Sequence, residues 1–164
     1  MSRMSVPTDK KASRRFDSPE QEAFLSLWRT YDRLRALEDE LFGRYDLTAQ
    51  QYNALRLLRG GHPEALPTLT LGGRLVSRAP DITRLLDRLE ERGLIRRERL
   101  PDNRRVVHVG ITDAGLALLT QLDEEVRACH ARQLGHLSRA DLRTLIELLR
   151  EVRRPHEPAG SDWL

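Results

Sequence analysis

The chain has a single cysteine, Cys129, few aromatic side chains and no long apolar run among its 164 residues. One thiol cannot form an internal disulfide or a zinc site built from several thiolates. The apolar runs are far shorter than the ~20 residues that a helix needs to cross a bilayer. The first residues are charged and lack the apolar segment of a secretory signal. These absences predict an intracellular, cytoplasmic protein with no membrane span.

The motifs of common enzyme chemistry are also missing. The sequence contains no G-x-x-x-x-G-K-[ST], no G-x-S-x-G, no H-E-x-x-H and no C-x-x-C. His130 and His136 lie near Cys129 in the sequence, but the six-residue spacing of the two histidines does not place them on one helical turn. We therefore expect no catalytic residues, no metal site and no cofactor, and hence no enzyme.

Arginine, in contrast, is abundant and concentrated. The net charge is +3. Residues 1–16 carry five basic groups against one acid, and residues 74–105 carry ten arginines against six acids, so the rest of the chain is net acidic. A basic stretch on an otherwise acidic body is the charge distribution expected of a protein that binds a polyanion.

Apolar residues recur at helical spacing through most of the chain. Capping residues such as Thr48, Thr112 and Ser138 precede the helical segments, and the four residues from Thr48 and from Ser138 have capping-box spacing. Residues 1–17 are polar, without periodicity, and are expected to be a disordered basic tail. The pattern predicts helices over 19–43, 49–61, 68–76 and 80–93, a loop over 62–67, a helix after Thr112 and a helix over 139–152.

After Gly93 the spacing of apolar residues changes from helical to extended. Residues 94–100 and 106–111 are predicted strands, and residues 101–105 are a predicted turn. Three helices followed by a basic hairpin form a winged helix-turn-helix. The predicted fold is therefore mainly α with a small β-hairpin wing, and the winged core is flanked by longer amphipathic helices at both ends.

The helix over 80–92 has the two faces that a DNA recognition helix needs. Ile82, Leu85, Leu86 and Leu89 lie on one side, and Arg84 and Arg88 lie on the other. A major groove about 12 Å wide admits one helix, whose outer side must carry donors for bases and phosphates. The alternative is a solvated face on which these arginines pair with acids such as Asp81 and Asp87.

Four segments of the sequence follow one another in a characteristic order: residues 47–51 (LTAQQ), 82–95 (ITRLLDRLEERGLI), 102–104 (DNR) and 111–115 (ITDAG). Together they resemble the MarR family of transcription regulators. Residues 47–51 are similar to that family's L-T-x-x-Q start of its second helix, and residues 82–95 look like its recognition helix and first wing strand. Residues 102–104 (DNR) match its D-x-R wing motif, and residues 111–115 (ITDAG) are similar to its L-T-x-x-G junction. The resemblance covers roughly residues 20–152.

The resemblance implies a homodimeric regulator, usually a repressor, that binds a pseudo-palindromic operator in double-stranded DNA. Many members of the family lose DNA affinity when a small aromatic or amphipathic effector binds. The terminal helices form the dimer interface in this family. The organisation expected on this basis is a dimerisation helix over 18–47, a DNA-binding region over 48–111, dimerisation helices over 112–153 and a tail over 154–164.

The resemblance also implies roles for individual residues. Arg104 would enter the minor groove, with Asp102 holding its guanidinium, and Thr83 and Arg84 would meet phosphates or bases. We extend the predicted DNA-binding surface to the neighbouring basic residues Arg88 and Arg105. Arg78 and Asp81 would lie at the groove-facing start of the recognition helix. Asp81 either accepts a hydrogen bond from cytosine or caps the helix.

The third predicted helix departs from the family pattern. The segment Leu71-Gly72-Gly73 stands where the family more often has a polar residue and an alanine. Two adjacent glycines weaken a helix, but they also permit a close approach of a neighbouring element. The sequence leaves open whether this helix is frayed or unusually close to its neighbour.

Three aromatic residues and the cysteine have two interpretations each. Trp28, Tyr31 and Tyr52 either line an effector pocket or pack in the core at helical spacing. Cys129 continues an apolar stripe, which favours core packing or a dimer seam over a redox role. The alternative function for the whole chain is a winged helix that binds only other proteins. It predicts an uncharged or acidic wing tip, whereas this tip carries Arg104 and Arg105.

Overall fold

A computed structural model describes residues 16–79 and 81–163 of the chain. The chain divides into two units, residues 1–35 and residues 36–164. The described part of the first unit is mainly the first half of a long helix. The second unit contains the rest of that helix and all other elements, and it holds the buried core.

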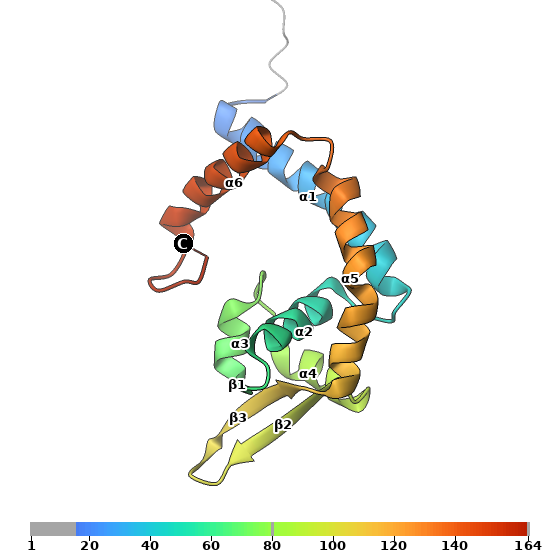
Figure 1. Cartoon of the computed structure of the whole chain (residues 1–164). Coiled ribbons are helices and arrows are strands. Elements are labelled where there is room, and N and C mark those ends of the chain that lie inside the picture. Colours follow the sequence, from blue (N-terminus) through green and yellow to red (C-terminus); the bar gives the residue numbers. More distant parts are fainter. Residues whose placement is uncertain (1–15, 80, 164) are drawn as a thin grey trace, which may run out of the picture. The chain divides into compact units, whose positions relative to one another are not determined.

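The fold class predicted from the sequence is confirmed: the described residues are mostly helical, with one small antiparallel sheet (Figure 1). Each predicted helix is present. The elements in chain order are α1 (Pro19–Gly43), α2 (Ala49–Gly61), β1 (Leu66–Pro67), α3 (Thr68–Arg74), α4 (Ile82–Glu91), β2 (Ile95–Leu100), β3 (Asn103–Ile111), α5 (Asp113–Leu134), α6 (Arg139–Arg153) and the short 3-10 helix η1 (Arg154–His156).

The sheet has three strands in the order β1-β3-β2. Val109 of β3 pairs with Leu66 on one side and with Arg97 on the other. The prediction of a plain loop over 62–67 was therefore wrong at its end, where two residues form β1. A two-residue strand has no alternation to detect, and only its pairing with β3 makes it a strand.

The turn of the wing is shorter than the predicted residues 101–105. β3 already begins at Asn103, which pairs with Leu100, so Pro101 and Asp102 alone connect the strands. Asn103 is typical of turns by its own propensity. Here the backbone hydrogen bonds of the hairpin override that propensity and extend the strand, which makes the wing narrow up to its tip.

Leucine side chains of α2, α3, α4 and α5 form the core of the second unit. In Figure 1 the helices α2, α3 and α4 gather beside the sheet and the first part of α5. The predicted apolar side of α4 is confirmed, because Leu85, Leu86 and Leu89 are buried. The largest fully buried side chains are Leu55, Leu58, Leu71, Leu86, Leu89, Val109, Leu119 and Leu122.

The predicted caps form at the start of three helices. Thr48 and Gln51 make a complete capping box at α2, and Thr112 accepts from the backbone N–H of Gly115 at α5. Ser138 caps α6 by accepting from the N–H of Asp141. The Asp141 carboxylate accepts a hydrogen bond from the Ser138 hydroxyl at 2.6 Å. The hydrogen bonds to the hydroxyls of Thr48, Thr112 and Ser138 satisfy backbone donors that the first turn of a helix leaves free, whereas the bond from Ser138 to the Asp141 carboxylate joins two side chains and is not the reciprocal bond of the predicted capping box.

Two glycines end α4 and begin α5 for geometric reasons. Gly93 has φ +68°, and the N–H groups of Gly93 and Leu94 donate to the carbonyls of Glu90 and Leu89. This is a Schellman ending, which favours glycine. At Gly115 a Cβ atom would lie 2.3 Å from the Leu94 carbonyl oxygen, so no side chain fits where α5 meets the sheet.

Helix α3 is close to its neighbour rather than frayed. A Cβ on Gly72 would lie 3.2 Å from Ile82 Cδ1, a closer approach than most side chains tolerate. The helix ends at Arg74, two residues before the predicted end, because the backbone N–H of Val76 donates to the Asn53 side chain instead. Helix α4 likewise begins two residues later than predicted, after Asp81; Pro80 lies outside the described residues.

The ends of the chain differ from the core. Helix α6 contains no buried residue, and the part of α1 in the first unit exposes Phe24, Trp28 and Tyr31. Beyond η1, Asp162 lies 3.1 Å from Arg74 Nε, which ties the predicted tail to α3. The predicted disordered tail over 1–17 lies almost entirely outside the described residues. Among the described helices, none has the length and apolarity needed to cross a membrane.

Candidate nucleic-acid interface

Helix α4 presents a polar face opposite its buried leucines. Thr83, Arg84 and Arg88 are exposed on it. Within the described residues, neither arginine has an acidic side chain within ion-pair distance. The sequence-based alternative, in which these arginines pair with acids on their own helix, is therefore not what the structure shows. Asp87 instead pairs with a residue of the wing.

Asp81 caps the N-terminus of α4. Its Oδ1 accepts a hydrogen bond from the backbone N–H of Arg84 at 2.9 Å. Of the two sequence-based interpretations of this residue, the structure confirms the capping role. The cap satisfies one of the free N–H groups of the first turn and favours the dipole of the helix.

The loop between α3 and α4 is held by side chains of α2. Asn53 Oδ1 accepts from the N–H of Val76 at 2.9 Å, and Gln50 Nε2 donates to Ser77 Oγ at 2.9 Å. Arg78 is exposed in this loop, next to the start of α4. Because α2 fixes the loop, Arg78 lies on a defined part of the surface rather than on a free connection.

The C-terminal end of α4 is anchored to the segment between α1 and α2. Arg92 Nη1 donates to the carbonyl of Asp46 at 2.6 Å, and Arg92 Nη2 donates to the carbonyl of Tyr45 at 3.1 Å. The Thr112 hydroxyl donates to the Gly93 carbonyl at 2.6 Å. The C-terminal end of the helix is thus fixed by hydrogen bonds to other elements, and α2 holds the loop that leads to its N-terminal end.

A hollow of about 290 Å³ lies between the start of α2 and the polar face of α4. Arg84 and Arg88 bring two positive charges to it, and Thr48 and Gln50 bring polar side chains. Positive and polar groups around an open hollow suit an anionic group such as a backbone phosphate. The residues that line it are Thr48, Gln50, Gln51, Asp81, Arg84, Leu85 and Arg88.

Arg104 and Arg105 are both exposed at the tip of the wing. Arg99 Nη1 donates to the backbone carbonyl of Arg104 at 2.6 Å, which ties the two strands together at this point. Among the described residues Asp102 forms no ion pair with Arg104. The holding of the Arg104 guanidinium by Asp102 therefore stays a prediction.

Comparison with known proteins identifies the family. Residues 47–107 match the sequence profile of the MarR family. The crystal structure of a MarR transcription factor from Planctomyces limnophilus is 61% identical, covers 82% of this chain and 98% of its own, and has a TM-score of 0.66. The chain belongs to the MarR family.

Two further relatives are less similar in sequence to this MarR-family chain. BpsR of Bordetella bronchiseptica, whose DNA binding is regulated by 6-hydroxynicotinic acid, is 26% identical, with 84% of this chain and 96% of BpsR covered and a TM-score of 0.73. PecS of Dickeya dadantii, an HTH-type transcriptional regulator, is 37% identical over 92 residues. That match spans 56% of this chain and about half of PecS, 55% of its length.

These relatives are transcription regulators and not enzymes. The family, the winged fold and the arginine-bearing α4 together make this chain a DNA-binding transcription regulator. The alternative of a winged helix that binds only proteins is not favoured.

The three aromatic residues proposed for an effector pocket occupy different surroundings. Trp28 and Tyr31 are exposed in the first unit, where Trp28 makes an edge contact with Phe24. Tyr52 is partly buried in the second unit, and its ring stacks on Phe42 with the ring centroids 4.5 Å apart. Burial raises the pKa of the Tyr52 hydroxyl. Tyr52 thus takes part in packing, as its helical spacing favoured.

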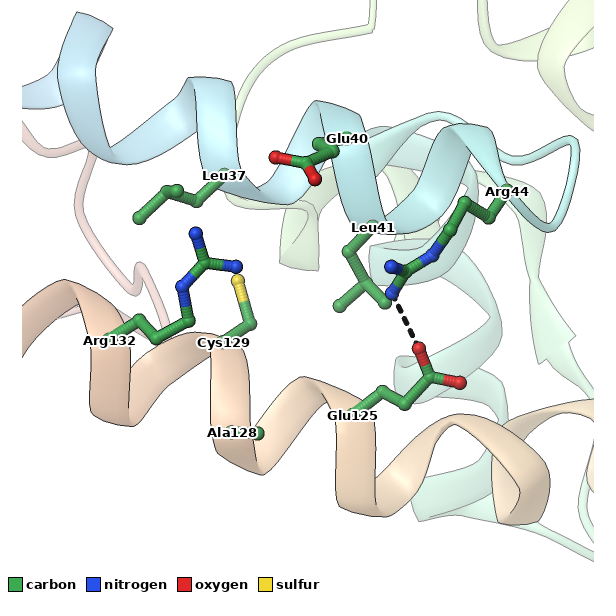
Figure 2. A pocket seen from close by; sticks show the side chains of 8 residues that line it. All are labelled: Leu37, Glu40, Leu41, Arg44, Glu125, Ala128, Cys129 and Arg132. Carbon is green, nitrogen blue, oxygen red and sulfur yellow. Dashed lines mark hydrogen bonds and ion pairs between the residues drawn. The ribbon is translucent and has the colours of Figure 1, made fainter.

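Cys129 is a core residue of this MarR-family chain, as its apolar stripe predicted. Figure 2 shows its Sγ beside the Arg132 guanidinium, in a cavity of about 120 Å³ between the end of α1 and α5. Burial raises the pKa of the thiol, so it stays protonated at neutral pH. The other lining residues are Leu37, Glu40, Leu41, Arg44, Glu125 and Ala128.

Sequence reasoning missed the residues that position this surface. Gln50 and Asn53 hold the loop before α4, and Arg97 of β2 binds carboxylates of α4. Their partners are 7 to 27 positions away in the sequence. The helical and strand periods relate only residues two to four positions apart, so neither period could have found these contacts.

Proposed function

We propose that two copies of the chain bind a pseudo-palindromic operator in double-stranded DNA. The α4 helix of each copy would enter a major groove, and its wing would reach the adjacent minor groove. The observation that carries this proposal is the exposed arginine face of α4, on which neither Arg84 nor Arg88 has an acidic partner among the described residues. Arg92 holds the C-terminal end of this helix, and α2 holds the loop before it. A fixed, unneutralised cationic face suits a polyanion that runs past it.

Each predicted site residue has a role in this proposal. Arg84, Arg88 and Thr83 meet bases and phosphates in the major groove, and Arg78 meets the backbone beside it. Arg104 enters the minor groove, where the negative potential favours a guanidinium, and Arg105 binds the flanking phosphates. Asp102 orients Arg104 once DNA is bound. Asp81 keeps its capping role.

The homodimer is supported by apolar surface on the terminal helices. On α6, Ile146 is 52% exposed, Leu148 59% and Val152 54%. Large apolar side chains exposed on one helix favour a protein partner. We propose that residues 18–47 and 112–153 supply the interface, so that two α4 helices lie about 34 Å apart, one turn of DNA.

We further propose that the protein is a repressor under the control of a small aromatic or amphipathic effector. The relation to BpsR, whose DNA binding responds to 6-hydroxynicotinic acid, supports this. An effector releases DNA only if it binds better to a dimer shape whose α4 helices no longer match the operator. Trp28 and Tyr31, both exposed, are the aromatic residues best able to meet it. A regulator of this kind acts where the genomic DNA lies, in the cytoplasm.

Selection of bound sites from random DNA tests the central proposal and supplies the operator. We expect a palindromic sequence with two half-sites. Arg104→Ala should then weaken operator binding by roughly 1–3 kcal/mol and reduce the salt dependence. Arg56→Ala is the matched control, because Arg56 is an exposed arginine on α2 outside the proposed DNA contacts and outside the segments proposed for dimerisation. Recovery of no preferred sequence, or equal affinity of both variants in a gel-shift titration at fixed salt, would refute the proposed DNA contacts.

A further inference from the structure

Arg97 joins the wing to the recognition helix. Its backbone N–H donates to Glu90 Oε1 at 3.0 Å, and its Nε and Nη2 donate to Glu90 Oε2 at 2.9 and 2.5 Å. Its Nη2 also lies 2.7 Å from Asp87 Oδ1. One residue of β2 is thus bound to two carboxylates of α4, with two of these bonds from the guanidinium to a single oxygen.

These bonds engage the Nε and Nη2 donors of Arg97 with carboxylates of its own chain. The Arg97 side chain is 26% exposed, whereas Arg96 and Arg99 on the same strand are exposed. Hydrogen bonds from Arg97 lower the pKa of Glu90, and the same bonds raise the pKa of Arg97. The pair is therefore fully charged at neutral pH, and its guanidinium is already engaged before any DNA arrives.

The bonds of Arg97 restrict the angle between α4 and β2, which apolar packing alone does not define. Only the short segment from Arg92 to Leu94 separates α4 from β2, and buried Leu94 and Ile95 hold the two elements together. Apolar contacts set a distance but are not directional. A guanidinium that binds two carboxylates has a defined geometry and adds a second point of attachment. Two points of attachment fix the angle between the helix and the strand.

The bonds also change the charge that DNA would meet. Asp87 and Glu90 stand on the same short helix as Arg84 and Arg88. Unpaired, these carboxylates would place two negative charges beside the phosphates and oppose binding. Arg97 neutralises these two carboxylates from the wing side, which reduces the negative charge on α4 near Arg84 and Arg88.

We propose that Arg97 is a positioning residue: it fixes the angle between the recognition helix and the wing and shields DNA from Asp87 and Glu90, without touching DNA itself. This rests on the DNA binding proposed above. Its consequence is that Arg104 at the wing tip and Arg84 on α4 can meet neighbouring grooves at the same time only when Arg97 is in place.

The test compares Arg97→Gln and Arg97→Lys with the wild-type dimer on the selected operator. We expect both to bind roughly tenfold more weakly, because lysine keeps the charge but cannot reproduce a guanidinium fork. Wild-type affinity of either variant would overturn the proposal. Arg56→Gln is the control, because Arg56 is an exposed arginine on α2 outside the proposed DNA contacts and the proposed dimer interface.

A double-mutant cycle separates positioning from a general loss of stability. If Arg97 sets the wing, Arg104→Ala should cost less in the Arg97→Gln background than in the wild type, because the wing is then already misplaced. Strictly additive losses at a temperature well below both unfolding transitions would contradict this. If the wild-type protein binds no DNA at all, the proposed function fails; if only the Arg97 variants behave like wild type, the inference alone fails.

Discussion

Helices α4 and α6 are both amphipathic, yet the chain covers the apolar side of only one of them. Helix α4 buries three leucines against α2, α3 and the sheet. Helix α6 buries nothing, and Ile146, Leu148 and Val152 stay exposed on it. The same type of pattern therefore serves two purposes. In the winged-helix region it builds a core within one chain, and in the terminal helix it leaves large apolar side chains exposed, which we propose meet a second copy.

The largest effect on stability should follow from a substitution in the buried core of the second unit. Leu86 of α4 is fully buried, so Leu86→Ala should lower the free energy of unfolding by about 2–5 kcal/mol through lost burial and a residual cavity. Leu69→Ala on α3 removes the same atoms from a side chain that is 91% exposed and should change stability by less than about 0.5 kcal/mol. Urea denaturation measures both. Equal losses would contradict the burial assigned to α4.

A charge on α6 should change assembly rather than folding. Ile146→Glu should convert the dimer to a monomer of 18.9 kDa in equilibrium sedimentation, because the carboxylate would be buried unpaired in the interface. Operator affinity should fall by roughly two orders of magnitude, since each half-site would then be bound without the other.

Glu147→Gln is the control for that experiment, because Glu147 is exposed on the same helix and its substitution adds no charge. The circular dichroism spectrum of Ile146→Glu should keep the helical signal of the wild-type protein. A wild-type protein that already sediments at 18.9 kDa at micromolar concentration would remove α6 as the dimer interface.

The smallest effects on stability should come from the helix caps of α2 and α6, which are both hydroxyl side chains. Thr48→Ala removes a complete capping box at α2, and Ser138→Ala removes a cap at α6. Each should cost about 1 kcal/mol in the dimer. Only Thr48→Ala should also weaken DNA binding, because Thr48 lines the hollow beside Arg84 and Arg88. A loss of operator affinity by Ser138→Ala at saturating dimer concentration would contradict this division.

The recognition helix could be predicted because its information is local. The spacing of Leu85, Leu86 and Leu89 shows the buried side, and Arg84 and Arg88 then fall on the other. Capping residues and Gly93 mark the ends of helices for reasons of backbone hydrogen bonding alone. The same local chemistry left Asp81 ambiguous, since a carboxylate at that position suits a cap as well as a base. The bond from the Arg84 N–H shows that Asp81 caps the helix, and a contact with a base stays a prediction.

The positioning contacts could not be predicted in the same way. β1 exists only through pairing with β3, some forty positions later. Arg97 is one of three arginines that stand close together on β2, and nothing in the local pattern distinguishes it from Arg96 or Arg99. It is distinguished by Glu90 and Asp87, which the turn at Gly93 brings opposite it.

The order of residues by itself determined which segments are helical and which side of each is apolar, since these depend on neighbours within a turn of the chain. The tertiary structure alone decided which apolar sides are covered and which arginines are free. An arginine forms an ion pair only if folding brings a carboxylate within about 4 Å of it. No short stretch of sequence encodes that distance. Arg84 and Arg97 have the same side chain, and only folding left the first exposed and engaged the second with Glu90 and Asp87.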